Sequence, residues 1–316
     1  MQKNEMFDLI IIGGGPTGMF AAYYAGMREL KTKLIESLPQ LGGQIELMYP
    51  EKIIRDIGAI PEIKGKQLIK NLHEQLNNFP TDISTKETVL TIQKETDYFI
   101  VTTSQASYYG KSVLLTSGQG LFEPRKLTIE HNQEYEKTNL HYYVQDLELY
   151  RNKELAILGG GDSAVDWALM LEKIAKKVYL VHRRNRFRAH EASVSELKES
   201  SIEILTPYLL ESLTGDSQQV QKIHLKERRG DRQLTLPVDF LIVNYGFMSD
   251  SLQLENWGLK VERASASVSQ QMASNIPGIF AAGDAADFEG KVKLIATGFG
   301  EVPTAINSII RYLDIY

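Results

Sequence analysis

Two segments of the chain share one pattern of hydrophobic and polar positions. In the first, the apolar run from Phe7 to Ile12 has the length of a strand, and after a glycine-rich turn residues 19–27 are small and apolar and predict a helix. In the second, the apolar run from Leu155 to Leu158 leads into a similar turn and a similar helical stretch. A strand, a glycine turn and a helix in this order predict βαβ units, so the pattern favours an α/β fold.

The first turn has the spacing G-x-G-x-x-G at Gly13, Gly15 and Gly18. The first glycine permits a tight turn, the second lets a pyrophosphate approach the backbone, and the third lets the helix pack closely on the strand. The next predicted strand ends at Glu36, whose carboxylate can accept hydrogen bonds from ribose hydroxyls. Because all these parts occur in order, we predict a dinucleotide site here rather than a purely structural turn.

The second turn has the spacing G-x-G-x-x-A at Gly159, Gly161 and Ala164. Glu36 follows Gly18 by eighteen residues, and His182 follows Ala164 by the same interval. A basic segment therefore stands where the first copy has its ribose-binding acid.

This basic segment contains His182, Arg183, Arg184 and, in the following turn, Arg188. Guanidinium groups bind phosphate bidentately, so the segment predicts a site for the 2′-phosphate of NADPH. The alternative is a solvated basic surface, which is common for charge runs after strands. Ser163 is suited to donate its hydroxyl to a phosphate. The predicted NADP(H) site comprises Gly159, Gly161, Asp162, Ser163, Ala164, His182, Arg183, Arg184 and Arg188.

Length and composition limit the remaining chemistry. The 316 residues predict about two domains, and no apolar run approaches the ~20 residues that span a bilayer, so we expect a cytoplasmic protein. A net charge of −5 argues against general nucleic-acid binding. The chain contains no cysteine, and its six histidines show no metal-ligand spacing. Redox chemistry would therefore depend on a bound cofactor.

A third segment near the C-terminus, "NIPGIFAAGDAADF", has an apolar run at 279–282 followed by Gly283 and Asp284. An aspartate at a glycine turn after a strand can hydrogen-bond the hydroxyls of a ribityl chain. The next stretch predicts a helix that begins near Pro303 or Thr304, and such a helix N-terminus can stabilise negative charge on a flavin.

With these stretches in place, the chain resembles the two-dinucleotide-domain flavoproteins of the thioredoxin-reductase type. More narrowly, it resembles the bacterial thioredoxin-reductase-like ferredoxin (flavodoxin)–NADP⁺ reductases. The resemblance is carried by "IIGGGPTG", "IESLPQLGGQ", "YPEK", "ILGGGDSAVDWALMLE", "HRRNRFRAHE", "LIVNYGF", "FAAGD" and "GFGEVPTA". It covers essentially the whole chain and implies FAD and NADP(H) as cofactors.

The resemblance also assigns the residues of the flavin site. It implies that Gln44 lies beside the isoalloxazine ring, that Tyr49 stacks on it and that Asp284 binds the ribityl or phosphate portion. Val89 would contact the cofactor through its backbone, although its side chain suits an ordinary core position equally well. The complete implied FAD site is Gly13, Gly15, Thr17, Gly18, Glu36, Gln44, Tyr49, Asp56, Val89, Phe122, Asp284 and Thr304.

The resemblance implies two Rossmann-like domains and a homodimer. Residues 1–117 and 245–316 would form a discontinuous FAD domain, and residues 118–244 an inserted NADP(H) domain. Relatives often continue into a C-terminal tail that covers the second flavin face, whereas this sequence ends at "RYLDIY". The resemblance therefore assigns no residue to that face.

One departure from thioredoxin reductases decides the expected acceptor. Those enzymes carry a CxxC shortly before the second glycine turn, where this chain has Tyr142–Gln145. Electrons would then pass from the flavin directly to ferredoxin or flavodoxin. Another acceptor (a quinone, ferric chelate or oxygen) and a non-catalytic redox sensor are the alternatives. Acidic carriers would dock on a basic surface, for which Lys226–Arg232 is a candidate, although that run is more typical of a solvated hairpin.

Overall fold

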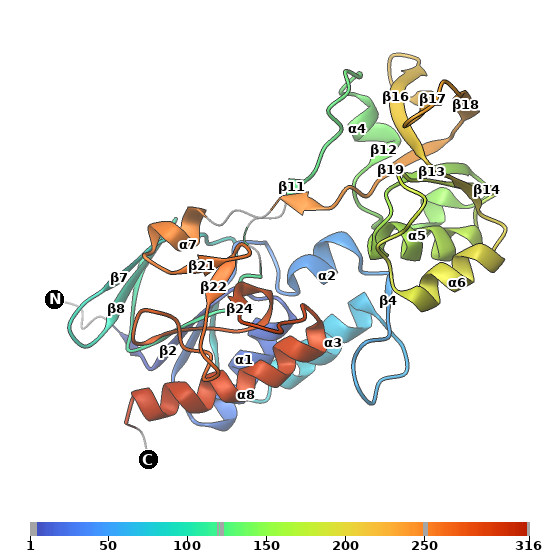
Figure 1. The fold of residues 1–316 in the computed structure, drawn as a ribbon. Coiled ribbons are helices and arrows are strands. Elements are labelled where there is room, and N and C mark those ends of the chain that lie inside the picture. The colour runs from blue at the N-terminus through green and yellow to red at the C-terminus, as the bar shows by residue number, and fades with distance from the viewer. Residues whose placement is uncertain (1–4, 119, 121–122, 249–251, 315–316) are drawn as a thin grey trace. The chain divides into compact units, whose positions relative to one another are not determined.

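The computed structural model describes residues 5–118, 120, 123–248 and 252–314, and the chain divides into two compact units (Figure 1). The first unit combines Met1–Phe122 with Ser249–Tyr316, and the second is Glu123–Met248. The second unit is thus an insertion in the sequence of the first. No helix within the described ranges is both long and apolar enough to cross a bilayer.

A five-stranded parallel sheet forms the centre of the first unit. Its order is β6 (Asp82–Ser84), β3 (Thr32–Ile35), β2 (Leu9–Ile12), β10 (Val113–Leu115) and β23 (Ile279–Ala281). All residues of β2, β3, β10 and β23 are buried. Short, fully buried and largely apolar strands are typical of parallel sheets covered on both faces.

Helices and a second sheet cover this centre. Helix α1 (Pro16–Met27) packs against α3 (Gly65–Leu76) and α8 (Ile295–Tyr312) (Figure 1). Small residues on α1, including Gly18, Ala21 and Ala22, are buried and allow close packing. The second sheet has the order β1 (Met6–Phe7), β9 (Ser107–Gly110), β8 (Phe99–Thr103) and β7 (Val89–Lys94).

Helix α8 begins eight residues before Pro303, so the predicted start near Pro303 or Thr304 is wrong. Pro303 lies inside the helix, where its ring nitrogen cannot donate to the carbonyl of Phe299. The helix persists because its apolar face, which includes Val302 and Ile306, is buried in the core of the unit. Tertiary packing therefore outweighs the local signal of the proline and of two glycines in the first turns.

Short elements complete the first unit. They are α2 (Gly43–Met48), β4 (Ile53–Ile54), β5 (Ile63–Lys64), α7 (Leu252–Asn256), β21 (Val261–Glu262), β22 (Ser265–Ser267), the 3₁₀ helix η2 (Gly283–Ala285) and β24 (Ala286–Asp287). Of these, α2 and η2 carry residues of the predicted flavin site.

The second unit repeats the parallel arrangement. Its main sheet has the order β12 (Leu140–His141), β19 (Phe240–Val243), β13 (Glu154–Leu158), β14 (Lys177–Val181) and β15 (Glu203–Leu205). Helix α5 (Asp162–Glu172) packs on β13 and β14, and α6 (Glu191–Glu199) packs against α5 (Figure 1). The predicted α/β fold with two Rossmann-like sheets is confirmed.

An antiparallel sheet of β16 (Tyr208–Gly215), β17 (Val220–Glu227) and β18 (Gln233–Pro237) completes the second unit. Ile223 and Leu225 of β17 share a buried core with Ala156 and Leu158 of β13. The remaining elements are β11 (Glu123–Pro124), α4 (Tyr135–Thr138), η1 (Leu147–Tyr150) and β20 (Phe247–Met248).

Candidate cofactor sites

The first glycine turn joins β2 to α1, and its glycines have the geometry that a phosphate-binding turn needs. Gly13 has φ +105°, and a Cβ atom there would lie 2.5 Å from the Cα of Ser117. A Cβ at Gly18 would lie 1.9 Å from the carbonyl oxygen of Gly13. At Gly15 the nearest atom to an added Cβ is 3.9 Å away, so this position is open to a ligand.

The N-terminus of α1 is free to receive an anion. Gly15 is the N-cap and makes no side-chain cap, Pro16 is the first helical residue, and the first turn contains no acidic residue. The unpaired N–H groups and the helix dipole therefore favour a phosphate at this point. Thr17, a predicted FAD ligand, lies in this turn, and its side chain approaches Gly283.

Glu36 lies directly after β3 and is 6% exposed. Its Oε2 accepts a hydrogen bond from Gly14 N at 2.7 Å, and its Oε1 accepts one from Leu38 N at 2.8 Å and one from Ser37 Oγ at 3.1 Å. A carboxylate offers about four lone-pair positions. Glu36 thus orders the glycine turn and keeps acceptor capacity for a ribose hydroxyl.

Gln44 lies in α2, which follows a loop that packs on the glycine turn. Gly42 and Gly43 precede it with φ +120° and +57°, and a Cβ at Gly43 would lie 2.9 Å from the Cα of Gly15. These positions require glycine because of both their conformation and this close approach. The structure therefore brings Gln44 close to the phosphate-binding turn.

Tyr49 ends α2 and lies within electrostatic reach of two predicted flavin-site carboxylates. Burial is the main cause that raises the pKa of Tyr49 to about 12, and the negative charges of Asp284 and Asp56 add to it. The phenol is therefore neutral at physiological pH. All three are residues of the predicted flavin site, and the charges of the two carboxylates act on the Tyr49 phenol.

A buried ion pair fixes the turn that carries Asp284. Gly283 N donates to Glu301 Oε2 at 2.8 Å, and the Gly283 carbonyl accepts from Lys291 Nζ at 3.0 Å. Lys291 and Glu301 also pair with each other, with side chains 1% and 7% exposed. Burial raises the pKa of Asp284 itself. This pair could not be predicted: Glu301 belongs to the stretch "GFGEVPTA", but nothing in the sequence links it to Lys291.

Two predicted FAD residues lie differently from the rest, and a third is outside the described residues. The Val89 carbonyl accepts a hydrogen bond from Gln253 Nε2 at 2.6 Å, so this backbone acceptor is already engaged, and its side chain is buried. Thr304 is exposed in the middle of α8 and not at a helix N-terminus. Phe122 lies outside the described residues.

The second glycine turn joins β13 to α5 and repeats the geometry of the first. Gly159 has φ +154°, and a Cβ there would lie 2.5 Å from the carbonyl oxygen of Asn244 and 2.8 Å from the Cβ of Ala164. At Gly161, the N-cap of α5, no atom lies within 4 Å of an added Cβ. The first turn of α5 presents Ser163, which is exposed.

Two buried polar atoms beside this turn have no hydrogen-bond partner among the described residues. They are Asn244 Oδ1 and His182 Nε2. The Asn244 backbone lies against Gly159, and the His182 ring lies against Gly160. Buried polar atoms are rarely left unpaired in a folded protein, so the turn fits a ligand that supplies partners. Burial also lowers the pKa of His182, and the charges of nearby arginines add to this effect.

The predicted arginines gather at this turn without counterions. Arg188 N donates to the Gly160 carbonyl at 2.7 Å, which brings its segment beside the glycines. Arg183, Arg184 and Arg188 are exposed, and none forms a salt bridge with a carboxylate in the described part of the chain. The positive charges of Arg188 and Arg183 lower the pKa of Arg184. An uncompensated cluster of this kind fits a phosphate.

Asp162, the remaining predicted NADP(H) residue, begins α5. Its Oδ1 accepts a hydrogen bond from His190 N at 3.0 Å. Asp162 thus ties the loop that carries Arg188 to the first turn of the helix.

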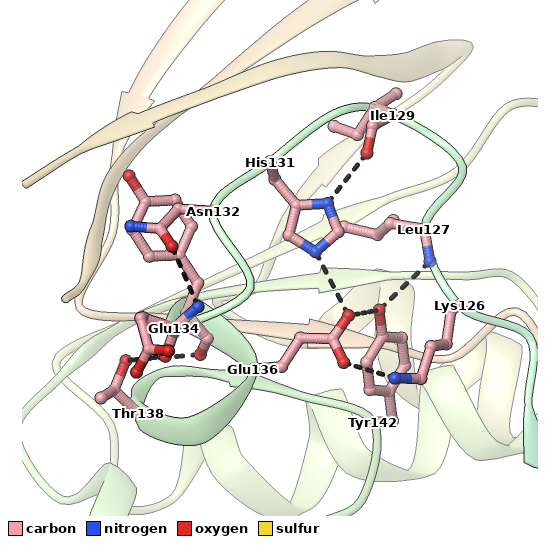
Figure 2. Close-up of polar contacts among 10 residues, drawn as sticks. Lys126, Leu127, Ile129, His131, Asn132, Glu134, Glu136, Thr138 and Tyr142 are labelled. Carbon is pink, nitrogen blue, oxygen red and sulfur yellow. Dashed lines mark hydrogen bonds and ion pairs between the residues drawn. The ribbon is translucent and has the colours of Figure 1, made fainter. Parts of the chain in front are cut away.

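Tyr142 begins the segment Tyr142–Gln145, which stands where the resemblance to thioredoxin reductases would imply a CxxC. Figure 2 shows the polar network around this tyrosine. The Tyr142 hydroxyl donates to Glu136 Oε1 at 3.1 Å and accepts from Leu127 N at 3.2 Å. Lys126 and His131 also bind the Glu136 carboxylate, at 2.6 and 3.2 Å. Burial is the main cause that raises the pKa of Tyr142 to about 12. Tyr142 therefore has a structural role in tying the segment before α4 to the end of β12.

Known proteins with similar sequences span both units. A family model described as pyridine nucleotide-disulphide oxidoreductase matches residues 7–308. The ferredoxin–NADP reductase of Halalkalibacterium halodurans is 49% identical over 314 residues, which cover 99% of this chain and 95% of that protein. The ferredoxin–NADP reductase 2 of Bacillus subtilis is also 49% identical over 314 residues, which cover 99% of this chain and 94% of that protein.

Solved structures agree with this result. The thioredoxin reductase of Lactococcus lactis in its FR conformation superposes with a TM-score of 0.86 at 27% identity and covers 98% of this chain and 100% of its own. The thioredoxin reductase of T. acidophilum gives the same TM-score at 23% identity, with 98% of each chain covered, which bears on the fold alone.

Proposed function

The chain belongs to the pyridine nucleotide-disulphide oxidoreductase family, and we propose that it transfers electrons between NADPH and a ferredoxin or flavodoxin. It is an oxidoreductase whose cofactors are FAD and NADP(H). When bound, FAD supplies the exchange of electron pairs with NADPH and of single electrons with a carrier.

The absence of cysteine from the sequence carries the choice of acceptor. A relay through a protein disulfide needs two thiols, and the segment expected to hold them contains Tyr142 in a hydrogen-bonded network instead. The relatives that match over almost the whole chain are named ferredoxin–NADP reductases. Both observations support direct transfer from the flavin to a carrier protein.

In this proposal the first unit holds FAD and the second holds NADP(H). The α1 N-terminus would bind the pyrophosphate of FAD and Glu36 a ribose, while Tyr49 and Asp284 would lie at the flavin end. Because Tyr49 stays neutral, it would cover a ring face and exclude water without adding charge. The α5 N-terminus and the three arginines would orient NADPH. The homodimer and the cytoplasmic location predicted from the sequence belong to this proposal.

The proposal is tested by reduction of cytochrome c with NADPH, with and without added ferredoxin, and with NADH as a control. We expect ferredoxin to stimulate the rate strongly and NADPH to exceed NADH. A rate that prefers NADPH but ignores ferredoxin and flavodoxin would point to another acceptor, such as a quinone or ferric chelate. Failure of NADPH to bleach the flavin would instead favour a redox sensor over an enzyme.

A further inference from the structure

The loop between β17 and β18 lies beside the arginine cluster, although it is distant in sequence. The run Lys226–Arg232, for which the sequence favoured a solvated hairpin, lies in such a hairpin: Lys226 and Glu227 end β17, and residues 228–232 form the turn before β18. Arg228 and Arg229 are its first two turn residues, and both are exposed. Neither forms a salt bridge with a carboxylate in the part of the chain that the structure describes.

Backbone hydrogen bonds hold Arg228 next to the end of β14. His182 N donates to the carbonyl of Leu205 at 3.0 Å, and Tyr208 N donates to the carbonyl of His182 at 3.0 Å. Tyr208 pairs with Glu227, and Arg228 N donates to the carbonyl of Pro207 at 2.9 Å. The backbone of Arg228 is therefore fixed close to the point where the chain enters Arg183 and Arg184.

The electrostatics agree with this placement. After Arg188 and Arg183, the charge of Arg228 also lowers the pKa of Arg184. The positive charges of three guanidinium groups thus act on Arg184, and none of the four arginines forms an ion pair with a carboxylate of the described residues. Gathering like charges is unfavourable, and a bound anion would offset this repulsion.

We propose that Arg228 forms a fourth side of the site for the 2′-phosphate of NADP(H), which it reaches from the β17–β18 hairpin. The inference rests on the proposed function and extends it, because no motif around the glycine turn includes this residue. A phosphate monoester carries a charge near −2 and three acceptor oxygens at neutral pH, enough for more than two arginines. Arg228 is then a specificity-determining residue that distinguishes NADP(H) from NAD(H).

The test is calorimetric titration of the FAD-loaded protein with 2′,5′-ADP and with 5′-AMP, which differs from it only by lacking the 2′-phosphate. We expect Arg228→Ala to weaken the binding of 2′,5′-ADP about tenfold, the loss typical of one charge-assisted hydrogen-bonded contact, and to leave the binding of 5′-AMP unchanged. Arg229→Ala, in the same turn, is the matched control and should change neither affinity. Unchanged 5′-AMP binding and flavin absorbance would show that Arg228→Ala is folded.

A further variant distinguishes the role of Arg228 from the proposed NADP(H) site as a whole. Arg184→Ala should also weaken the binding of 2′,5′-ADP selectively. If Arg184→Ala has that effect and Arg228→Ala resembles Arg229→Ala, the role of Arg228 is overturned while the NADP(H) site stands. If the wild-type protein binds both nucleotides equally, the NADP(H) assignment falls and the role of Arg228 falls with it.

Discussion

At the scale of single residues, Glu36 connects the first glycine turn to the loop after β3. Its two oxygens accept hydrogen bonds from two backbone N–H groups, Gly14 and Leu38, while the side chain is almost fully buried. Only a carboxylate can accept on both sides, because an amide has one accepting oxygen and one donating nitrogen. The residue therefore prepares the turn for the pyrophosphate in addition to offering an acceptor to the ribose.

We expect Glu36→Gln to weaken FAD binding by about tenfold. The amide NH₂ would face one of the two backbone donors, and an unsatisfied buried group costs about 1–3 kcal/mol. The measurement is titration of FAD-depleted protein with FAD, followed by flavin fluorescence. Glu87→Gln is a matched control: Glu87 is 3% exposed and is bonded by Thr103 and Tyr108 outside the turn, so this change should spare FAD affinity. Wild-type affinity in Glu36→Gln would refute this role.

A second residue-scale prediction concerns His182. Burial is the main cause that lowers its pKa, and the positive charges of Arg183, Arg184 and Arg188 lower it further. A backbone hydrogen bond to Arg186 opposes this shift. The unfolded chain would protonate His182 near pH 6.5, but the folded chain only at lower pH. Below pH 6.5 the unfolded state therefore binds more protons than the folded state. The free energy of unfolding consequently decreases as the pH is lowered through this range. We expect wild-type protein to lose more unfolding free energy between pH 7.5 and 5.5 than His182→Gln, measured in urea.

The control for this effect is His190→Gln, since the His190 side chain is 75% exposed. It should keep the wild-type loss of stability on acidification. An equal loss in His182→Gln and wild type would mean that His182 does not carry the effect.

At the scale of elements, the Lys291–Glu301 pair links α8 to the turn of η2. Both side chains are buried, so removing one partner leaves an uncompensated charge. We expect Lys291→Met to lower the free energy of unfolding by about 3 kcal/mol, measured in urea. It should also accelerate release of FAD, because the pair holds both polar backbone groups of Gly283 beside Asp284.

The double variant Lys291→Met with Glu301→Gln should regain most of this stability. The amide introduced by Glu301→Gln is neutral and still offers an oxygen to Gly283 N, so the charge penalty disappears while the hydrogen bond remains. Lys176→Met is the control, because it removes an exposed ion pair: Lys176 binds Glu154, and its side chain is 67% exposed. This change should lower the free energy of unfolding by less than about 1 kcal/mol. A double variant as unstable as Lys291→Met alone would contradict this account.

The elements also show which features a sequence can predict. The strands and glycine turns were predictable because short-range sterics dictate them, as at Gly13, where any side chain would collide with Ser117. The start of α8 was not, because its helical conformation before Pro303 depends on packing against distant residues. For the same reason, the position of Arg228 beside the arginine cluster was not predictable, because it depends on strand pairing with a segment that is remote in sequence. Predicted positions were thus reliable where the interactions are local.

At the scale of the whole molecule, the chain builds two compact units, each with its own hydrophobic core. One core includes Ile10, Leu114 and Ile306, which come from both halves of the divided unit, and the other includes Leu158 and Ile223 of the inserted unit. A unit with its own core can unfold as a unit of its own. The predicted FAD residues described by the structure lie in the first unit and the predicted NADP(H) residues in the second, so each ligand should stabilise a different transition.

We therefore expect calorimetry of the whole chain to resolve two thermal transitions that respond to different ligands. Adding 2′,5′-ADP at 100 times its dissociation constant contributes about 2.7 kcal/mol to the unit that binds it, and for a unit of this size that raises its transition by roughly 8 °C. Removing FAD should lower the other transition. Arg184→Ala, if it weakens the binding of 2′,5′-ADP about tenfold, should reduce the response to the same concentration of 2′,5′-ADP to about half and keep the response to FAD. A single transition that both ligands shift would mean that the two units unfold together, whatever their separate cores.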